Sequence, residues 1–258
     1  MKVKNIVFSA SFFGAVCFSL PLAAADDFSP TEAKLKAALA MEHRSAENRE
    51  RDENRNAVDA MRFCGLRDDM TVIEFGPGNG WYSEILGPVL QEKGRLILVY
   101  KESWMDQLDS LLALDFMSSA EKHPIDLSWN SEEKRFNVGE VSYKVENADM
   151  ALNIREYHNL DSEGAGRLNT ATFDALRPGG AYCIIDHTRR HMEPKNTENR
   201  RRADPVRVIL EVQAAGFELV AYSDLFFKPD DELRYEVGRR SVKGNTDRFA
   251  LLFRKPPQ

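Results

Sequence analysis

The stretch VIEFGPGNGWYSEIL, residues 72–86, decides the fold of this chain. A strand-like run leads into glycines at positions 76, 78 and 80, and an amphipathic segment follows. Glycine permits a sharp turn and removes the Cβ that would keep a ligand away from the backbone. The free N–H groups of the following helix would then favour a carboxylate or phosphate. The stretch predicts a strand–turn–helix unit that binds a ligand.

The glycine spacing narrows the class of ligand. It is G-x-G-x-G rather than the dinucleotide pattern G-x-G-x-x-G, which disfavours a nicotinamide oxidoreductase. A phosphate-binding G-x-x-x-x-G-K-[ST] loop is absent from the sequence, which disfavours a nucleoside triphosphate. Glu102 lies 22 positions beyond Gly80, where an acid after the second strand would meet ribose hydroxyls.

Strand-like and helix-like segments alternate along the rest of the chain. This alternation predicts a mostly parallel sheet covered by helices on both faces. The loops after Phe75, Tyr100, Ile154 and Asp186 should then gather at one crevice. We expect helices over 31–64, 81–91, 104–119, 162–175 and 206–217, and strands over 71–75, 95–100, 141–145, 150–154, 181–186, 218–226 and 247–255.

Four motifs in order resemble those of the class I methyltransferases that use S-adenosylmethionine. They are EFGPGNG at 74–80, ADMALNIREYHNL at 148–160, ALRPGGAYCIIDH at 175–187 and DRFALLFRK at 247–255. Together they look most like a subgroup of exported bacterial predicted methyltransferases. The resemblance implies a Rossmann-like α/β domain over 67–258 with a mostly parallel seven-stranded sheet. Residues 26–66 would form a helical N-terminal extension.

The resemblance also implies a cofactor, S-adenosylmethionine, and residues that hold it. Glu74 matches the acid that contacts the methionine amino group, and Gly76, Gly78 and Gly80 match the loop beneath the cofactor. Glu102 would match the ribose acid, whereas the adenine contact has no clear counterpart. Trp81 and Tyr82 either stack near the cofactor or pack the first helix on the sheet. The expected binding set is Glu74, Gly76, Pro77, Gly78, Gly80, Trp81, Tyr82, Glu102 and Asn153.

Candidate catalytic residues follow the fourth and fifth expected strands. Methyl transfer requires alignment, exclusion of water and, for some acceptors, removal of a proton. His158 and His187 are candidate general bases, and Tyr157 and Asp186 are polar neighbours at the same strand ends. The alternative for these residues is a structural role in bracing loops or capping a helix.

The loop at 188–202 raises two further possibilities. His187 and His191 are four residues apart, but the loop offers no third ligand at a suitable spacing, so we expect no metal. Its arginines, at 189, 190 and 200–202, form either a solvated face or a site for a carboxylate or phosphate of the substrate.

The N-terminus predicts export. Lys2 and Lys4 precede an apolar run and then Ala23–Ala25, the layout of a signal peptide over residues 1–25. A periplasmic location would follow. A lipoprotein signal at Cys17 is the less favoured alternative, because Val16 suits that processing poorly. No later segment resembles a membrane span, and the net charge of −6 argues against nucleic-acid binding.

Three further expectations concern cysteines, the charged segment and function. Cys64 and Cys183 are expected to be buried thiols rather than a disulfide. Residues 43–56 would be a solvated helix, a flexible arm or a lid over the cleft. We expect methyl transfer to a small molecule, which would be anionic if the basic loop binds it, with a non-catalytic exported binding protein as the alternative.

Overall fold

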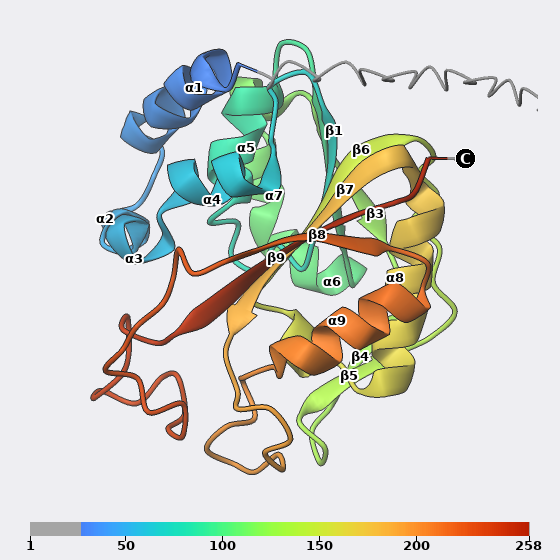
Figure 1. The fold of residues 1–258 in the computed structure, drawn as a ribbon. Coiled ribbons are helices and arrows are strands. Elements are labelled where there is room, and N and C mark those ends of the chain that lie inside the picture. Colours follow the sequence, from blue (N-terminus) through green and yellow to red (C-terminus); the bar gives the residue numbers. More distant parts are fainter. Residues whose placement is uncertain (1–26, 258) are drawn as a thin grey trace, which may run out of the picture.

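A seven-stranded sheet forms the centre of the protein (Figure 1). The structure, a computed structural model, describes residues 27–257, so the expected signal peptide lies outside the described residues. The strand order is β3-β2-β1-β6-β7-β9-β8. The strands of this sheet are β1 (Thr71–Phe75), β2 (Arg95–Tyr100), β3 (Ala120–Pro124), β6 (Ala148–Ile154), β7 (Leu176–His187), β8 (Glu218–Ser223) and β9 (Arg248–Arg254).

The sheet is mostly parallel, as expected. Strands β3, β2, β1, β6 and β7 pair in parallel, and β9 is antiparallel to both β7 and β8. The strand order reverses between β1 and β6, so the segments that follow these two strands diverge, one leading to β2 and the other to β7. Ligands bind at such a point in open α/β sheets. Phe75 and Asn153 are paired there, directly before the glycine turn and the segment that carries His158.

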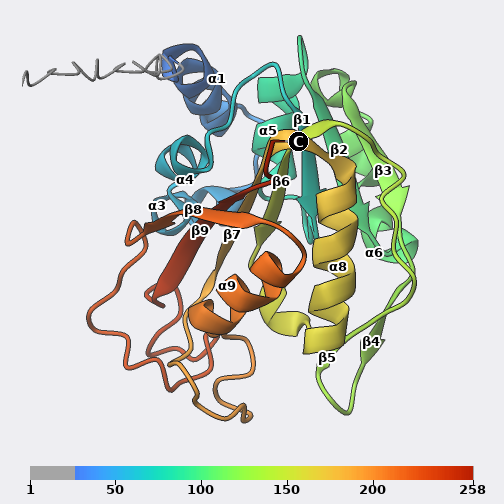
Figure 2. The same cartoon turned by 45° about the vertical axis from the view of Figure 1, so that its right-hand side comes forward.

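Helices cover both faces of the sheet (Figures 1 and 2). On one face α1 packs against α5 and α4, and on the other α8 packs against α9 and β7. A hairpin of β4 (Leu127–Asn130) and β5 (Arg135–Val138) packs beside α8. The helices are α1 (Ser29–Ala40), α2 (Ala46–Arg49), α3 (Asp52–Arg55), α4 (Ala57–Cys64), α5 (Ser83–Leu90), α6 (Glu102–Met105), α7 (Asp109–Leu112), α8 (Ser162–Ala175) and α9 (Pro205–Ala214).

Three expected elements are wrong. Residues 31–64 form four short helices rather than one, because Ser45 caps a new helix and Asn56 takes a left-handed conformation. The expected helix at 104–119 is broken into α6, α7 and two 3₁₀ turns. Residues 141–145 form no strand, and the third parallel strand is β3 instead. Its sequence, AEKHP, has adjacent charged residues and no apolar alternation, as is common in a strand that pairs on one side only.

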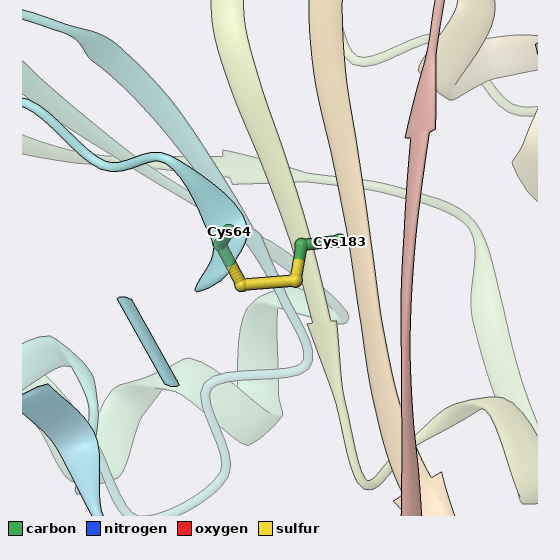
Figure 3. The surroundings of a disulfide bond; sticks show 2 residues. All are labelled: Cys64 and Cys183. Carbon is green, nitrogen blue, oxygen red and sulfur yellow. A yellow bond between two sulfur atoms is a disulfide. The ribbon is translucent and has the colours of Figure 1, made fainter. Parts of the chain in front are cut away.

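The expectation of two free thiols is also wrong. Cys64, the last residue of α4, forms a disulfide with Cys183 in the middle of β7, and their Cα atoms lie 5.5 Å apart (Figure 3). Both cysteines are buried, as expected. Their pairing depends on α4 packing on the sheet across 119 residues of sequence, which no local pattern reveals. The bond fastens the N-terminal helices to the central sheet.

The charged segment 43–56 packs against the start of α5. Glu84 accepts hydrogen bonds from Arg44 Nε at 2.7 Å and from Asn48 Nδ2 at 2.9 Å. Arg44 also makes two bonds to Asp52, and its side chain is completely buried. A buried charge is stable only with such partners. The segment is therefore neither a solvated helix nor an unattached arm.

None of the helices within residues 27–257 is long and apolar enough to cross a membrane.

Candidate functional site

A cavity of about 660 Å³ opens at the carboxyl ends of the paired strands β1 and β6. This volume is in the range of small-molecule and cofactor sites. The walls come from the glycine turn, the end of β2, the β4–β5 hairpin, the segment after β6 and the N-terminal extension. The lining residues are Arg51, Arg55, Glu74, Gly76, Pro77, Gly78, Asn79, Trp81, Tyr82, Tyr100, Ser103, Trp104, Gln107, Trp129, Phe136, Ile154, Arg155, Glu156, His158, Asn159, His187, Arg200, Arg201 and Val237.

The three glycines of the turn all have positive φ angles, of 68° at Gly76, 55° at Gly78 and 78° at Gly80. They differ in what a side chain would meet. A Cβ on Gly76 would collide with Glu156, and one on Gly80 would lie 2.8 Å from Leu108 Cδ2. A Cβ on Gly78 would meet nothing within 4 Å. Gly78 therefore exposes bare backbone to the cavity, whereas Gly80 packs behind the turn and does not line it.

Glu74 places a carboxyl group on the cavity floor. It is buried at the end of β1 and accepts a hydrogen bond of 2.7 Å from Ser83 Oγ. Burial raises the pKa of Glu74 to about 7, although the Ser83 hydrogen bond and the charge of Arg55 oppose the rise. A ligand ammonium group beside this carboxylate would supply a neutralising positive charge.

Glu156 places a second, half-buried carboxyl group at the cavity, and sequence reasoning missed it. It lies over Gly76 and accepts hydrogen bonds from Tyr100 at 3.3 Å and Asn159 at 3.0 Å. Burial raises the pKa of Glu156 to about 7, against the opposing effect of His158. The sequence did offer one indication of its role, because Glu156 lies within the polar stretch REYHNL.

Aromatic side chains form one wall of the cavity. Tyr100 ends β2, with its ring centroid 4.9 Å from Trp104 and 5.9 Å from Phe136. Trp129 extends the wall from the β4–β5 hairpin. Such a wall suits a flat ring system. Glu102, in contrast, is exposed at the start of α6 and does not line the cavity, so the structure does not support the expected ribose contact.

His158 and Asp186 form a dyad at the edge of the cavity. His158 Nδ1 lies 2.9 Å from Asp186 Oδ1, and Asp186 is completely buried. The backbone N–H groups of His158 and His187 donate to the same carboxylate at 2.9 and 2.7 Å. Since a carboxylate only accepts, Nδ1 of His158 carries the proton and Nε2 is left to accept one. Asp186 lies behind His158 rather than in the cavity wall, so it is a positioning residue.

His187 is held in a neutral, fixed orientation. Its Nδ1 lies 2.9 Å from the Thr246 hydroxyl, and Arg155 Nε donates to its Nε2 at 3.0 Å. Burial, followed by the charge of Arg155, holds the pKa of His187 well below its usual value. Both ring nitrogens are engaged, so the geometry favours His187 as a support for Arg155 rather than as a general base.

Two other expected site residues point elsewhere. The Tyr157 hydroxyl donates to Glu211 at 3.1 Å and accepts from Asn169 at 2.9 Å, away from the cavity. Burial raises the pKa of Tyr157 well above its usual value. Asn153 is buried in β6 and does not line the cavity either. Both residues belong to the packing between the sheet and α8.

Trp81 and Tyr82 line the cavity and also hold the extension in place. Trp81 donates its indole N–H to the carbonyl oxygen of Asn48 at 2.9 Å. Its ring lies under the guanidinium of Arg55, 4.6 Å from the ring centroid. Arg51 and Arg55 enter the cavity wall in this way, and sequence reasoning missed both because they belong to a uniformly charged segment.

The basic loop has several separate roles. Arg202 forms a completely buried ion pair with Asp231, and Arg201 pairs with Glu236. Arg190 donates to the backbone oxygen of Glu232. Only Arg200 and Arg201 of this loop line the large cavity. Most of the loop's arginines are therefore structural.

The part of the chain that the structure describes contains no group of three or more histidine, cysteine or acidic side chains arranged to hold a metal ion. His191, the residue considered with His187 as a ligand pair, instead lies 2.9 Å from Asp204 Oδ2.

Solved structures share this fold at low sequence identity. A SAM-dependent methyltransferase from Aquifex aeolicus is 16% identical with a TM-score of 0.57, over 87% of this chain and 98% of that chain. The [4+2]-cyclase SpnF is 13% identical with a TM-score of 0.59, over 91% and 96%. Human N-acetylserotonin methyltransferase, solved with SAM, is 12% identical with a TM-score of 0.52, over 89% of this chain and 57% of that one.

No family model matches the sequence, and no curated protein matches it. At identities of this size the solved structures establish the methyltransferase-like fold of the chain, while its activity has to be argued from the site.

Proposed function

We propose that this protein binds S-adenosylmethionine and transfers its methyl group to a small molecule that carries a negative charge. The observation that carries the proposal is the bare backbone of Gly78, which faces a 660 Å³ cavity at the carboxyl ends of β1 and β6. The resemblance of four sequence motifs to the class I methyltransferases and the shared fold of solved methyltransferases support it.

The residues around the cavity fit this cofactor. The turn at 76–80 offers backbone to the ligand, Glu74 offers a carboxylate for an ammonium group, and the wall of Tyr100 and Trp104 offers rings for stacking. When bound, S-adenosylmethionine supplies an electrophilic methyl group. The protein aligns the two ligands and excludes water, and these effects account for most of the rate enhancement in such a displacement.

His158 is the proposed general base. Asp186 holds its ring so that Nε2 can take a proton from the acceptor as that atom is methylated. The arginines of the cavity favour an acceptor with a carboxylate or phosphate.

We further propose that the protein acts outside the cytoplasm. Residues 1–25 have the layout of a signal peptide, and the Cys64–Cys183 disulfide is typical of oxidising compartments. Because S-adenosylmethionine is made in the cytosol, this location requires a supply of the cofactor beyond the inner membrane.

A second function is binding of a ligand without methyl transfer. Two observations favour it: Glu102, the expected ribose acid, does not line the cavity, and the side chain of Glu156 lies over the glycine turn. The structural likeness to a [4+2]-cyclase supports the general point that this fold hosts other chemistry.

Calorimetric titration of the mature protein with S-adenosylmethionine tests the proposal. We expect micromolar affinity that Gly78→Val abolishes, because its side chain would project into the cavity. Gly65→Val is the matched control, since Gly65 also has a positive φ, of 79°, and open space around its Cβ, but does not line the cavity. Absence of binding at millimolar cofactor, or equal loss in both variants, would refute the proposal.

A further inference from the structure

Four arginines from distant parts of the chain meet beside the cavity. Arg51 precedes α3, Arg55 ends it, Arg155 follows β6, and Arg248 begins β9. We call these residues the arginine cluster. Arg51, Arg55 and Arg155 line the cavity, and Arg248 adds its charge from beside them.

The cluster forms no direct ion pair. Within residues 27–257, no carboxylate oxygen lies within 4 Å of a nitrogen of these four side chains, and Asp186 acts on Arg155 and Arg248 only from a longer distance. Their partners are neutral: Arg55 lies over Trp81, Arg155 donates to His187, and Arg248 donates to the backbone oxygen of Asn54. The Nε atoms of Arg55 and Arg248 have no hydrogen-bond partner.

Burial makes this lack of partners unusual. Arg55 is 9% exposed and Arg248 is 6% exposed. Two other deeply buried arginines are paired, since Arg44 binds Glu84 and Asp52, and Arg202 binds Asp231. Arg189, also 6% exposed, has no ion pair within the described residues but does not line this cavity. Buried charge without a counter-ion is costly, so a group that retains it is expected to meet a ligand of opposite sign.

The lowered pKa values of the cluster agree with positive charge that the nearby carboxyl groups of Glu74 and Asp186 compensate only in part. Burial, followed by repulsion from Arg155, lowers the pKa of Arg55 to about 9. Burial also lowers the pKa of Arg248 to about 10, and that of Arg155 is lowered for the same reason. A bound anion would reverse these shifts.

We propose that the arginine cluster binds an oxyanion group, a carboxylate or phosphate, of a methyl acceptor that carries at least two negative charges. This inference rests on the proposed function. S-adenosylmethionine has one carboxylate, one ammonium and one sulfonium group, so it adds a net positive charge to the cavity. The single carboxylate of the cofactor can pair with one arginine at most, so we assign the remaining positive charge of the cluster to the acceptor.

The position of Arg155 connects the anion site to the proposed base. Arg155 binds His187, which adjoins Asp186, and Asp186 holds His158. The rings of His158 and His187 lie 6.5 Å apart between centroids. An oxyanion on Arg155 would thus bring the rest of a small acceptor within reach of His158 Nε2. Arg's planar fork suits a carboxylate or phosphate in such a role.

The test uses inorganic phosphate as the probe and S-adenosylhomocysteine as a cofactor analogue. Phosphate is titrated calorimetrically into the mature protein at low ionic strength, with and without the analogue. We expect one phosphate site whose affinity falls about tenfold to a hundredfold in Arg51→Met and in Arg155→Met. Arg190→Met is the control, because Arg190 lies outside the cavity, and it should leave phosphate binding unchanged.

The affinity for S-adenosylhomocysteine separates the two proposals. Arg51→Met should change it less than threefold, and because Arg51 is partly exposed this variant should keep the fold. Phosphate affinity that is unchanged in both cluster variants, or no phosphate binding at all, would overturn the inference. So would parallel loss of phosphate and analogue binding, which would assign the cluster to the cofactor carboxylate. Phosphate binding without analogue binding would uphold the anion site and refute the proposed function.

Discussion

Breaking the bond between Cys64 and Cys183 should lower the free energy of unfolding by about 5 kcal/mol. The two cysteines are separated by 119 residues, and the chain-entropy relation for a loop of that length gives about 4.9 kcal/mol at 25 °C. For a chain of this size the loss corresponds to a fall in Tm of about 10 to 20 °C. The effect should be large because the loop includes β1, β2, β3 and β6 of the central sheet.

Urea unfolding of the mature protein, oxidised and reduced, measures this difference. The reduced protein keeps both sulfur atoms, so it isolates the covalent link from packing. A Cys64→Ala/Cys183→Ala variant should be at least as unstable as the reduced protein. Alkylation of the denatured, unreduced protein should find neither cysteine free. Two free thiols, or a difference below about 1 kcal/mol between the oxidised and reduced forms, would refute the reasoning.

Three other changes probe the site and its support. His158→Ala should lower turnover by a factor of about 10² to 10⁴ while cofactor affinity stays the same. A radiolabelled methyl-transfer assay on an acceptor found by screening measures turnover. Unchanged turnover would exclude His158 as the base. The folded pKa of Glu74, about 7, exceeds the unfolded value of 4.5, so its contribution to stability falls as pH rises between them. Glu74→Gln should therefore be more stable than the wild type at pH 8 by about 3 kcal/mol in urea unfolding, and equal stability would contradict a raised pKa of Glu74. Arg44→Met should lower the free energy of unfolding by about 3 to 5 kcal/mol, because it leaves buried Glu84 without its ion-pair partner. Arg49→Met, on the exposed side of the same segment, should lower it by under about 1 kcal/mol. Similar losses in both variants would argue against a special role for the buried pair.

The glycine turn and the mostly parallel sheet were predictable because they depend on local patterns. The buried run at 95–100 and the turn at 76–80 each signal their structure within a few residues. The order of motifs then places Glu74 and His158 at one edge of the sheet. The expected fold and the position of the crevice were confirmed on this basis.

The remaining walls of the cavity depend on contacts between distant segments. Arg55 enters through the packing of the extension on Trp81, and Phe136 enters through a short hairpin with weak alternation. Tyr157 and His158 are adjacent in sequence, yet a 3₁₀ turn directs one toward Glu211 and the other into the cavity. Such differences arise from tertiary packing, which a sequence pattern does not specify.

The most direct measurement is a crystal structure of the mature protein grown with saturating S-adenosylhomocysteine. We expect its electron density against the backbone of Gly78, with the amino group toward Glu74 and the adenine ring along Tyr100 and Trp104. A cavity that stays free of the ligand, or a ligand bound elsewhere, would contradict binding of the cofactor at this turn and leave only the fold.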